Sequence, residues 1–228
     1  MKSFKFGSLV LVVFLFYLSA CQEKSNGIVN RSNYSTPIKV ACVGNSITFG
    51  SGINHRDSLS YPAQLQRMLG DSWEVRNYGV SGRTLLSKGD RPYINEPAFE
   101  DAMAFQPDVV LIKLGTNDTK PNNWEYKDEF KDDYRNLIES FQRLDSKPIV
   151  VLLKAVPAFP ERWGIRDSII HNHMNPMVEE LAKSMNLPII DLHEPMVGHG
   201  ELFPDLIHPN AEGAAIMASI IYNALIGD

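Results

Sequence analysis

The sequence predicts a three-layer α/β/α fold around a five-stranded parallel sheet. From residue 38 onward, short apolar runs rich in Val and Ile alternate with amphipathic stretches, and several runs are apolar on both faces. Continuous apolar strands are typical of parallel sheets that helices cover on both sides. The chain has 228 residues, of which 44% are hydrophobic, enough for one sizeable core. We therefore expect a single domain over residues 38–228.

Five runs read as strands, at residues 38–43, 73–78, 108–114, 148–155 and 188–192. Helical spacing appears between them. In the stretch 60–70, Leu65, Met68 and Leu69 share one face and Gly70 is a suitable C-cap. The stretch 125–145 places five large residues at helical spacing: Phe130, Tyr134, Leu137, Ile138 and Phe141. Stretches 172–186 and 210–226 supply further helices, and right-handed crossovers then give a doubly wound sheet.

The first 37 residues differ from the rest of the chain. A basic start, a short apolar run and the ending Leu-Ser-Ala-Cys at Cys21 indicate an export signal over residues 1–20, and this ending resembles a bacterial lipobox. In such lipoproteins the cysteine carries the lipid, so we expect an exported protein anchored in the bacterial cell envelope, facing the periplasm or the cell surface. An ordinary signal peptide is the alternative. The polar stretch 21–37 reads as a flexible tether, and Cys42, inside an apolar run, as a buried core residue.

The charge of the chain argues against a nucleic-acid partner. The formal net charge is −5, and acidic and basic residues are mixed along the sequence. Nucleic-acid binding normally requires a basic patch or stripe. We expect contact with a membrane only through a lipid on Cys21.

Three glycine-containing turns follow the first three predicted strands, at residues 44–46, 79–82 and 115–118. Open parallel sheets bind ligands outside the carboxyl ends of their strands, so these turns should converge on one site. The first turn holds Ser46. It lacks the lysine of a phosphate loop, and Thr48 stands where a nucleophile elbow has glycine. Ser46 can act as a nucleophile only if a base lies beside it.

His208 is the histidine whose surroundings suggest such a base. Asp205 precedes it by three residues, so one turn can bring the carboxylate to the ring, fix the tautomer and stabilise the imidazolium. Pro209 suits the first turn of the last helix. We interpret the remaining five histidines as surface residues: His55, His171, His173, His193 and His199. The pair at 171 and 173 could suggest a metal, but no further ligand cluster completes a site, so we expect no metal.

Acyl transfer also needs donors that stabilise an oxyanion. The candidates are the backbone N–H groups of Ser46 and Gly82 and the side-chain amide of Asn117. Glycine allows a close approach of substrate to the backbone, and the amide donates without changing its protonation. Glycines in strand-to-helix turns and Asx turns at Asn-Asp are also common for structural reasons, and this alternative stays open.

Taken together, these segments resemble the SGNH hydrolase superfamily, also called GDSL esterases. Its four blocks, Ser, Gly, Asn and Asp-x-x-His, occur here in order at Ser46, Gly82, Asn117 and Asp205 to His208, and the resemblance covers roughly residues 38–225. It implies a flavodoxin-like sandwich, Ser46 as nucleophile, His208 as base, Asp205 as its orienting partner, and an oxyanion hole of Ser46, Gly82 and Asn117. No metal or organic cofactor is implied.

Two positions qualify this resemblance. Asn45 departs from the family motif, which has Asp, so we expect altered hydrogen bonding in that loop. Ser81 is a second serine near the site, but the resemblance assigns the role there to Gly82.

The substrate is predicted less sharply. Loops 50–60, 83–99, 119–126 and 158–166 should shape the pocket, and they contain aromatic and cationic residues that suit sugar faces and acidic groups: Arg83, Arg91, Tyr93, Trp124, Phe159, Arg162 and Trp163. A lipid-anchored member of this superfamily resembles bacterial carbohydrate O-acetylesterases, which implies a small acyl ester on a glycan as substrate. The alternatives are a lysophospholipase or acyl thioesterase of the same superfamily, and a non-catalytic glycan-binding lipoprotein.

Overall fold

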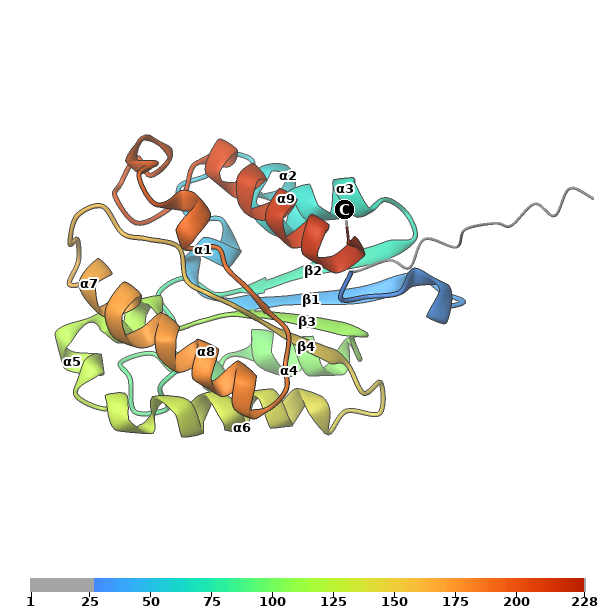
Figure 1. Ribbon diagram of the computed structural model, residues 1–228, viewed down its shortest axis with the longest axis horizontal. Coiled ribbons are helices and arrows are strands. Elements are labelled where there is room, and N and C mark those ends of the chain that lie inside the picture. Colours follow the sequence, from blue (N-terminus) through green and yellow to red (C-terminus); the bar gives the residue numbers. More distant parts are fainter. Residues whose placement is uncertain (1–26, 228) are drawn as a thin grey trace, which may run out of the picture.

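The computed structural model describes residues 27–227, which form one α/β/α sandwich (Figure 1). In this part of the chain a parallel sheet contains β1 (Ile38–Gly44), β2 (Trp73–Gly79), β3 (Val109–Lys113), β4 (Ile149–Leu153) and β5 (Ile189–Ile190), in the order β2-β1-β3-β4-β5. This is the strand order of flavodoxin-like sheets. The predicted three-layer fold is confirmed.

Helices cover both faces of the sheet (Figure 1). One layer contains α1 (Ser46–Phe49), α2 (Arg56–Leu59), α3 (Tyr61–Leu69) and α9 (Ala211–Ile226). The other contains α4 (Pro97–Ala104), α6 (Phe130–Gln142) and α8 (Asn175–Ser184), and the short helices α5 (Pro121–Trp124) and α7 (Asp167–Ile169) lie at the end of the sheet where the strands finish. A π-helical turn, Ile170–Met174, joins α7 to α8.

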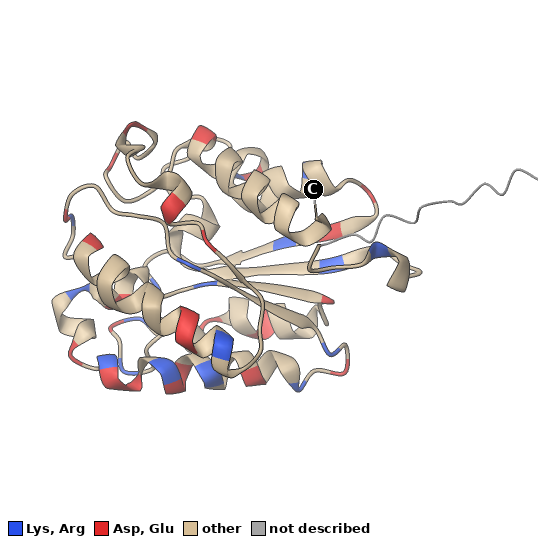
Figure 2. Ribbon diagram, viewed as in Figure 1, with Lys and Arg blue, Asp and Glu red and all other residues tan. Residues whose placement is uncertain are grey.

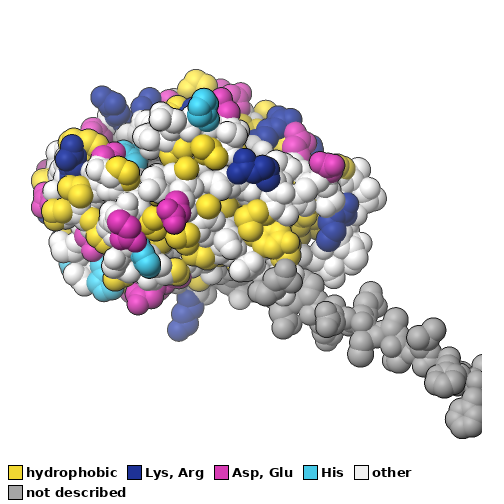
Figure 3. All heavy atoms as spheres, turned by 90° about the horizontal axis from the view of Figure 1, so that it is seen from above, with side chains coloured by type: hydrophobic (Ala, Val, Ile, Leu, Met, Phe, Trp, Pro, Cys, Tyr) yellow, Lys and Arg dark blue, Asp and Glu magenta, His cyan; other side chains and the backbone are white. Residues whose placement is uncertain are grey.

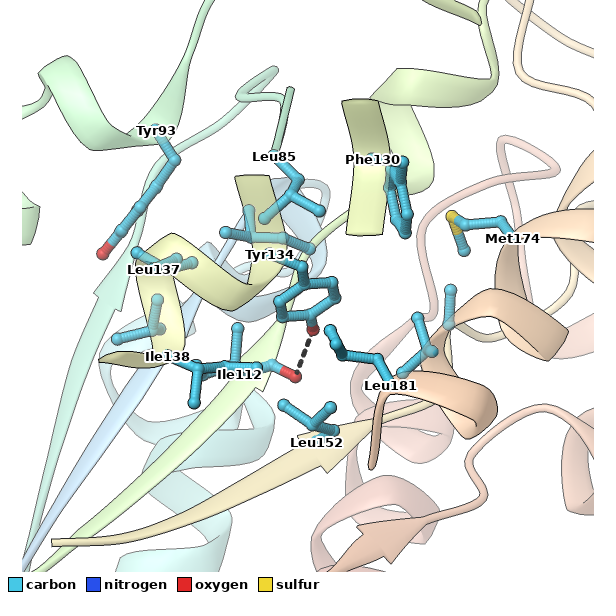
Figure 4. Packing of buried hydrophobic residues seen from close by; sticks show 14 of the residues in the cluster. Leu85, Tyr93, Ile112, Phe130, Tyr134, Leu137, Ile138, Leu152, Met174 and Leu181 are labelled. Carbon is cyan, nitrogen blue, oxygen red and sulfur yellow. Dashed lines mark hydrogen bonds between the residues drawn. The ribbon is translucent and has the colours of Figure 1, made fainter. Parts of the chain in front are cut away.

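Successive side chains along β3 point alternately into two hydrophobic cores, one on each face of the sheet. Val110 and Ile112 face the core beneath α4, α6 and α8, whereas Val109 and Leu111 face the core beneath α3 and α9. The five predicted residues of α6 are buried in the first core, where the Tyr134 hydroxyl donates to the Ile112 carbonyl at 3.3 Å (Figure 4). Burial of each large apolar side chain contributes about 1.5–3 kcal/mol to stability.

Three predicted details of the fold are wrong. Met68 is 40% exposed and does not share the buried face of Leu65 and Leu69, because α3 presents only a narrow stripe to the sheet. The last strand shrinks from 188–192 to Ile189–Ile190 because it lies at the edge of the sheet and pairs with β4 over two residues. Pro209 precedes Asn210, the N-cap of α9, and so stands outside the helix that it was expected to begin.

The flexible tether predicted for 21–37 is also wrong for part of its described residues. Ile28 and Val29 donate their backbone N–H groups to the carbonyls of Ala224 and Leu225, both at 2.9 Å, and Val29 is buried. This apolar pair therefore docks on the carboxyl end of α9. The predicted signal of residues 1–20, Cys21 and the rest of the tether up to residue 26 lie outside the described residues.

The surface has mixed character. Acidic and basic residues are interspersed along α6 and α8 (Figure 2). The face above α9, α3 and α2 carries hydrophobic side chains between charged and polar ones (Figure 3). None of the helices in residues 27–227 is both long enough and apolar enough to serve as a membrane span.

Candidate active site

Ser46 lies where the first strand turns into a helix. Asn45 caps α1 by accepting the Ile47 N–H on its side-chain oxygen at 3.2 Å, which leaves Ser46 as the first helical residue. Gly44 is required before this turn, because a Cβ at that position would collide with the side chain of Thr48. The tight turn places the nearly buried Ser46 side chain at the carboxyl edge of the sheet.

His208 connects Ser46 to Asp205 through hydrogen bonds of equal length. Its Nε2 lies 2.7 Å from Ser46 Oγ, and its Nδ1 lies 2.7 Å from Asp205 Oδ2. If Nδ1 carries the proton and donates a hydrogen bond to the carboxylate, Nε2 accepts a hydrogen bond from the serine hydroxyl, which is the arrangement a general base requires. The structure thus brings together the three residues predicted as a triad.

The Asp205 carboxylate is held by its own turn. Its Oδ1 accepts the backbone N–H groups of Ile207 at 3.0 Å and His208 at 2.7 Å, while Leu206 takes a positive φ of 74° between them. Partial burial raises the pKa of Asp205, but the backbone and ring donors of His208 outweigh it, so the pKa lies below its ordinary value. The carboxylate stays charged opposite the imidazole.

A neighbouring loop also contacts the turn that contains Asp205 and His208. The Phe159 N–H donates to the Leu206 carbonyl at 2.8 Å, and the Phe159 ring packs on Phe203 with 4.9 Å between centroids. The position of His208 is therefore fixed by this loop and by the turn itself, and not by the helical proline that the sequence suggested.

The predicted oxyanion donors line the same cavity as the serine and the histidine. This cavity has a volume of about 240 Å³ and is lined by Ser46, Ser51, Ser81, Gly82, Asn117, Lys120, Trp163, Ile165 and His208. Gly82 adopts a φ of 79°, which favours glycine. One N–H of the Asn117 amide donates to the Arg83 carbonyl at 3.0 Å, which leaves the second N–H available to a ligand.

Asp118 ties the two donor loops together. Its carboxylate oxygens accept the backbone N–H groups of Leu85 at 3.0 Å and Leu86 at 2.8 Å. Burial raises the pKa of Asp118 to about 6, although these two donors act in the opposite direction. Because Asp118 follows Asn117 and the bonded loop follows Gly82, this buried bridge fixes both donors relative to each other.

Two polar groups near the serine are buried with few partners. The Asn45 amide nitrogen has no hydrogen-bond acceptor among the described residues, which accords with the changed bonding expected where the family motif has Asp. Lys113, the last residue of β3, is fully buried, and its ammonium makes a 3.4 Å hydrogen bond to Thr116 Oγ1. This desolvation lowers the pKa of Lys113 to about 7. A single lysine within an apolar run was the sequence signal for this feature.

The other histidines separate into two groups. His55, His171, His173 and His199 are exposed, as predicted. His193 is 3% exposed, so its interpretation as a surface residue is wrong. Its backbone N–H binds the Asp191 carboxylate, and its ring Nε2 lies 3.5 Å from Asp167 Oδ1. Within residues 27–227, His, Cys, Asp and Glu side chains form no group of three or more that could hold a metal.

Of the seven aromatic and cationic loop residues predicted for the pocket, Trp163 is the one that lines the cavity of Ser46. Tyr93 and Trp124 are buried in the core. Trp163 does line the cavity, is 55% exposed, and lies 5.9 Å from the His208 ring between centroids. Ser81 bonds to the Ser51 hydroxyl at 2.6 Å. Ser51, Lys120 and Ile165 also line the cavity. They lie in the predicted pocket loops, but no motif in the sequence marks them individually.

Fold and side-chain geometry define an α/β protein with a hydrogen-bonded Ser–His–Asp arrangement at the carboxyl edge of a parallel sheet. Comparison with known sequences agrees with this class. The sequence model of the GDSL-like lipase/acylhydrolase family matches residues 42–216. The chain belongs to this family.

Individual relatives are similar over most of the chain. An acetylxylan esterase from Xylanibacter ruminicola is 46% identical over 82% of this chain, but the match spans only 43% of that longer protein. A carbohydrate acetylesterase from Sinorhizobium meliloti shares the fold, with a TM-score of 0.66, 20% identity and coverage of 82% of this chain and 97% of that one. A two-domain esterase active on acetylated mannans has a TM-score of 0.60 and 25% identity, over 82% of this chain and 48% of that one.

Proposed function

We propose that this protein is a serine esterase that removes small acyl groups, chiefly acetyl, from carbohydrates. The observation that carries the proposal is the pair of 2.7 Å contacts that link Ser46 Oγ, His208 and Asp205 at the edge of a cavity. A serine hydroxyl bonded to an imidazole that a carboxylate orients is the arrangement needed for nucleophilic acyl transfer.

The reaction has two halves. His208 Nε2 takes the proton of Ser46 as Oγ attacks the acetyl carbonyl, and the developing oxyanion is held by the N–H groups of Ser46, Gly82 and Asn117. His208 then gives the proton to the leaving sugar oxygen, which frees the alcohol. Water attacks the acetyl-serine with His208 as base, and acetate leaves as Ser46 regains its proton. Asp205 stays ionised and stabilises the imidazolium throughout.

The similarity to an acetylxylan esterase supports a carbohydrate ester as substrate. The cavity supports a short acyl group, because its volume of about 240 Å³ lies below the roughly 300–1,000 Å³ typical of sites for larger ligands. Trp163, half exposed beside His208, offers an aromatic surface of the kind that packs against sugar rings.

The alternatives gain no such support. A lysophospholipase or thioesterase needs an apolar groove that opens at the serine. A cavity of about 240 Å³ does exist elsewhere, but none of its lining residues belongs to the cavity of Ser46, and they include polar ones: Leu85, Ser87, Tyr93, Ile94, Leu114, Asp133, Asn136 and Leu137. A glycan-binding protein without catalysis would not need Ser46 within hydrogen-bond distance of His208.

The test compares the purified protein with Ser46→Ala and Asp205→Asn on 4-nitrophenyl acetate and acetylated xylan oligosaccharides. We expect turnover to fall by about 10³–10⁶ for Ser46→Ala and about 10⁴ for Asp205→Asn. Thermal unfolding of each variant should stay within a few degrees of the parent. A fluorophosphonate adduct on Ser46, located by peptide mass analysis, is the positive readout, and near-normal turnover of Ser46→Ala would refute the proposal.

We also propose that the protein is exported and held in the bacterial cell envelope by a lipid on Cys21. The support is the Leu-Ser-Ala-Cys ending after a short apolar run. Cys21→Ser should move the protein from the membrane fraction to the soluble fraction of expressing cells. Unchanged partitioning of this variant would contradict the anchor.

A further inference from the structure

Three positive side chains in the loops around the active-site cavity form no ion pair in the described part of the chain. Arg83 is neutralised, since its Nε lies 2.7 Å from the Glu96 carboxylate. By contrast, Arg91, Lys120 and Arg162 make no ion pair with any acidic residue in 27–227.

Two of these cations flank the oxyanion donors. Arg91 does not line the cavity itself, but its Nη1 lies 3.7 Å from the position that a Cβ on Gly82 would occupy, so the guanidinium lies next to a residue that does. Lys120 lines the cavity directly, and its stem packs 3.7–3.8 Å from the corresponding position on Gly164, next to Trp163. Both side chains therefore lie beside the cavity that contains Ser46 and His208.

The nearest acids in sequence form no ion pair with them. Asp90, beside Arg91, accepts the Asn123 amide at 3.0 Å. Glu161, beside Arg162, forms no ion pair in the described part of the chain, and the Arg162 guanidinium instead lies over the Trp163 ring at 4.7 Å. The residues that line the cavity include Lys120 but no carboxylate. An uncompensated positive rim of this kind favours an anionic ligand.

We propose that Arg91 and Lys120 form a subsite for a carboxylate, so that the preferred substrate is an acetylated glycan containing an acidic sugar. This inference rests on the proposed esterase function. A guanidinium matches a carboxylate with two parallel hydrogen bonds, and an ammonium adds a point charge. Trp163 supplies the adjoining apolar surface for the sugar ring.

The experiment uses two matched probes, the methyl glycosides of glucuronic acid and of glucose, each acetylated at the same hydroxyl. At low salt, kcat/KM should be at least about 10-fold higher for the acidic probe, as expected for one charge-assisted contact. Raising the ionic strength should reduce this preference, because these charges are exposed. Because the two cations share this preference, Lys120→Gln and Arg91→Gln should each lower the acidic-to-neutral ratio by about 3-fold.

Lys183→Gln is the control, because it removes the same charge from the exposed side of α8. It should leave the preference unchanged. If both probes are cleaved equally well, or if Lys120→Gln and Arg91→Gln lower both rates in parallel, the carboxylate subsite is refuted and the esterase stands. If neither probe nor 4-nitrophenyl acetate is cleaved, the proposed function itself fails.

Discussion

Replacing Lys113 by methionine should stabilise the protein. Lys113 is fully buried at the end of β3, where its ammonium has three N–H donors and one hydrogen bond, of 3.4 Å, to Thr116 among the described residues. Burial disfavours the charged form, so the pKa falls from 10.5 to about 7. The unfolded chain carries the same charge in water without this cost.

The size of the effect follows from the pKa. Each pKa unit corresponds to about 1.4 kcal/mol, so at pH 7 the buried ammonium lowers the free energy of unfolding by roughly 4 kcal/mol. Methionine has a similar length and no charge. Lys113→Met should therefore raise the free energy of unfolding by about 2–4 kcal/mol at pH 7, the lower value applying if its thioether packs imperfectly.

The pH dependence gives a sharper test than the size alone. Because the folded pKa lies below the unfolded one, the unfolded chain binds more protons between about pH 7 and 10.5, and the parent protein gains stability as pH rises through this range. The advantage of Lys113→Met should be largest below pH 7 and shrink by about 1.4 kcal/mol per pH unit above it. Burial also raises the pKa of Cys42, which acts in the opposite direction near pH 9, but this contribution is common to both proteins and cancels.

The assay is urea unfolding followed by tryptophan fluorescence between about pH 6 and 9, with Lys183→Met as a control for loss of an exposed charge. A stability difference that stays constant across this range, or a Lys113→Met protein that is less stable than the parent at pH 6, would show that the buried ammonium is not the cost inferred here.

Three further perturbations test other parts of the structure. Asp118→Asn replaces one of the two carboxylate oxygens that accept the N–H groups of Leu85 and Leu86 with an N–H₂ donor. It should lower the free energy of unfolding, measured in urea, by about 1–3 kcal/mol and should also lower kcat. Unchanged values for both would mean that Asp118 does not hold the two loops together. Trp163→Ala should raise KM for acetylated xylan oligosaccharides about 10-fold while 4-nitrophenyl acetate hydrolysis changes little, and an equal effect on both substrates would argue against a sugar surface. Val29→Ser should lower the free energy of unfolding by about 2 kcal/mol, whereas no change would mean that docking on α9 contributes nothing.

Most of the fold could be predicted from the spacing of apolar residues along the chain. The five residues spaced through α6 are the five that the structure buries, because a long amphipathic helix repeats its apolar face several times. The site residues followed from topology: when parallel strands end at one edge, turns far apart in sequence converge. Ser46 and His208 are 162 residues apart and lie 2.7 Å from each other at Oγ and Nε2.

The features that could not be predicted from the sequence depend on contacts between segments that are far apart in the chain. His193 carries no local signal of burial, and only the packing of the chain after β5 against the α7 region places its ring beside Asp167. Ile28 and Val29 lie in a polar stretch, and their docking depends on carbonyls at the far end of the chain. Asp118 follows the motif asparagine, but its role appears only once the loop at Leu85 and Leu86 is in place.

The docking of Val29 on the end of α9 has a geometric consequence. In Figure 1 this contact lies at the opposite end of the sheet from α1, where Ser46 stands. The described chain therefore enters the domain at the end of the sheet remote from Ser46. If the proposed lipid on Cys21 is present, it is joined to the domain at that end, so the cavity of Ser46 lies away from the attachment point.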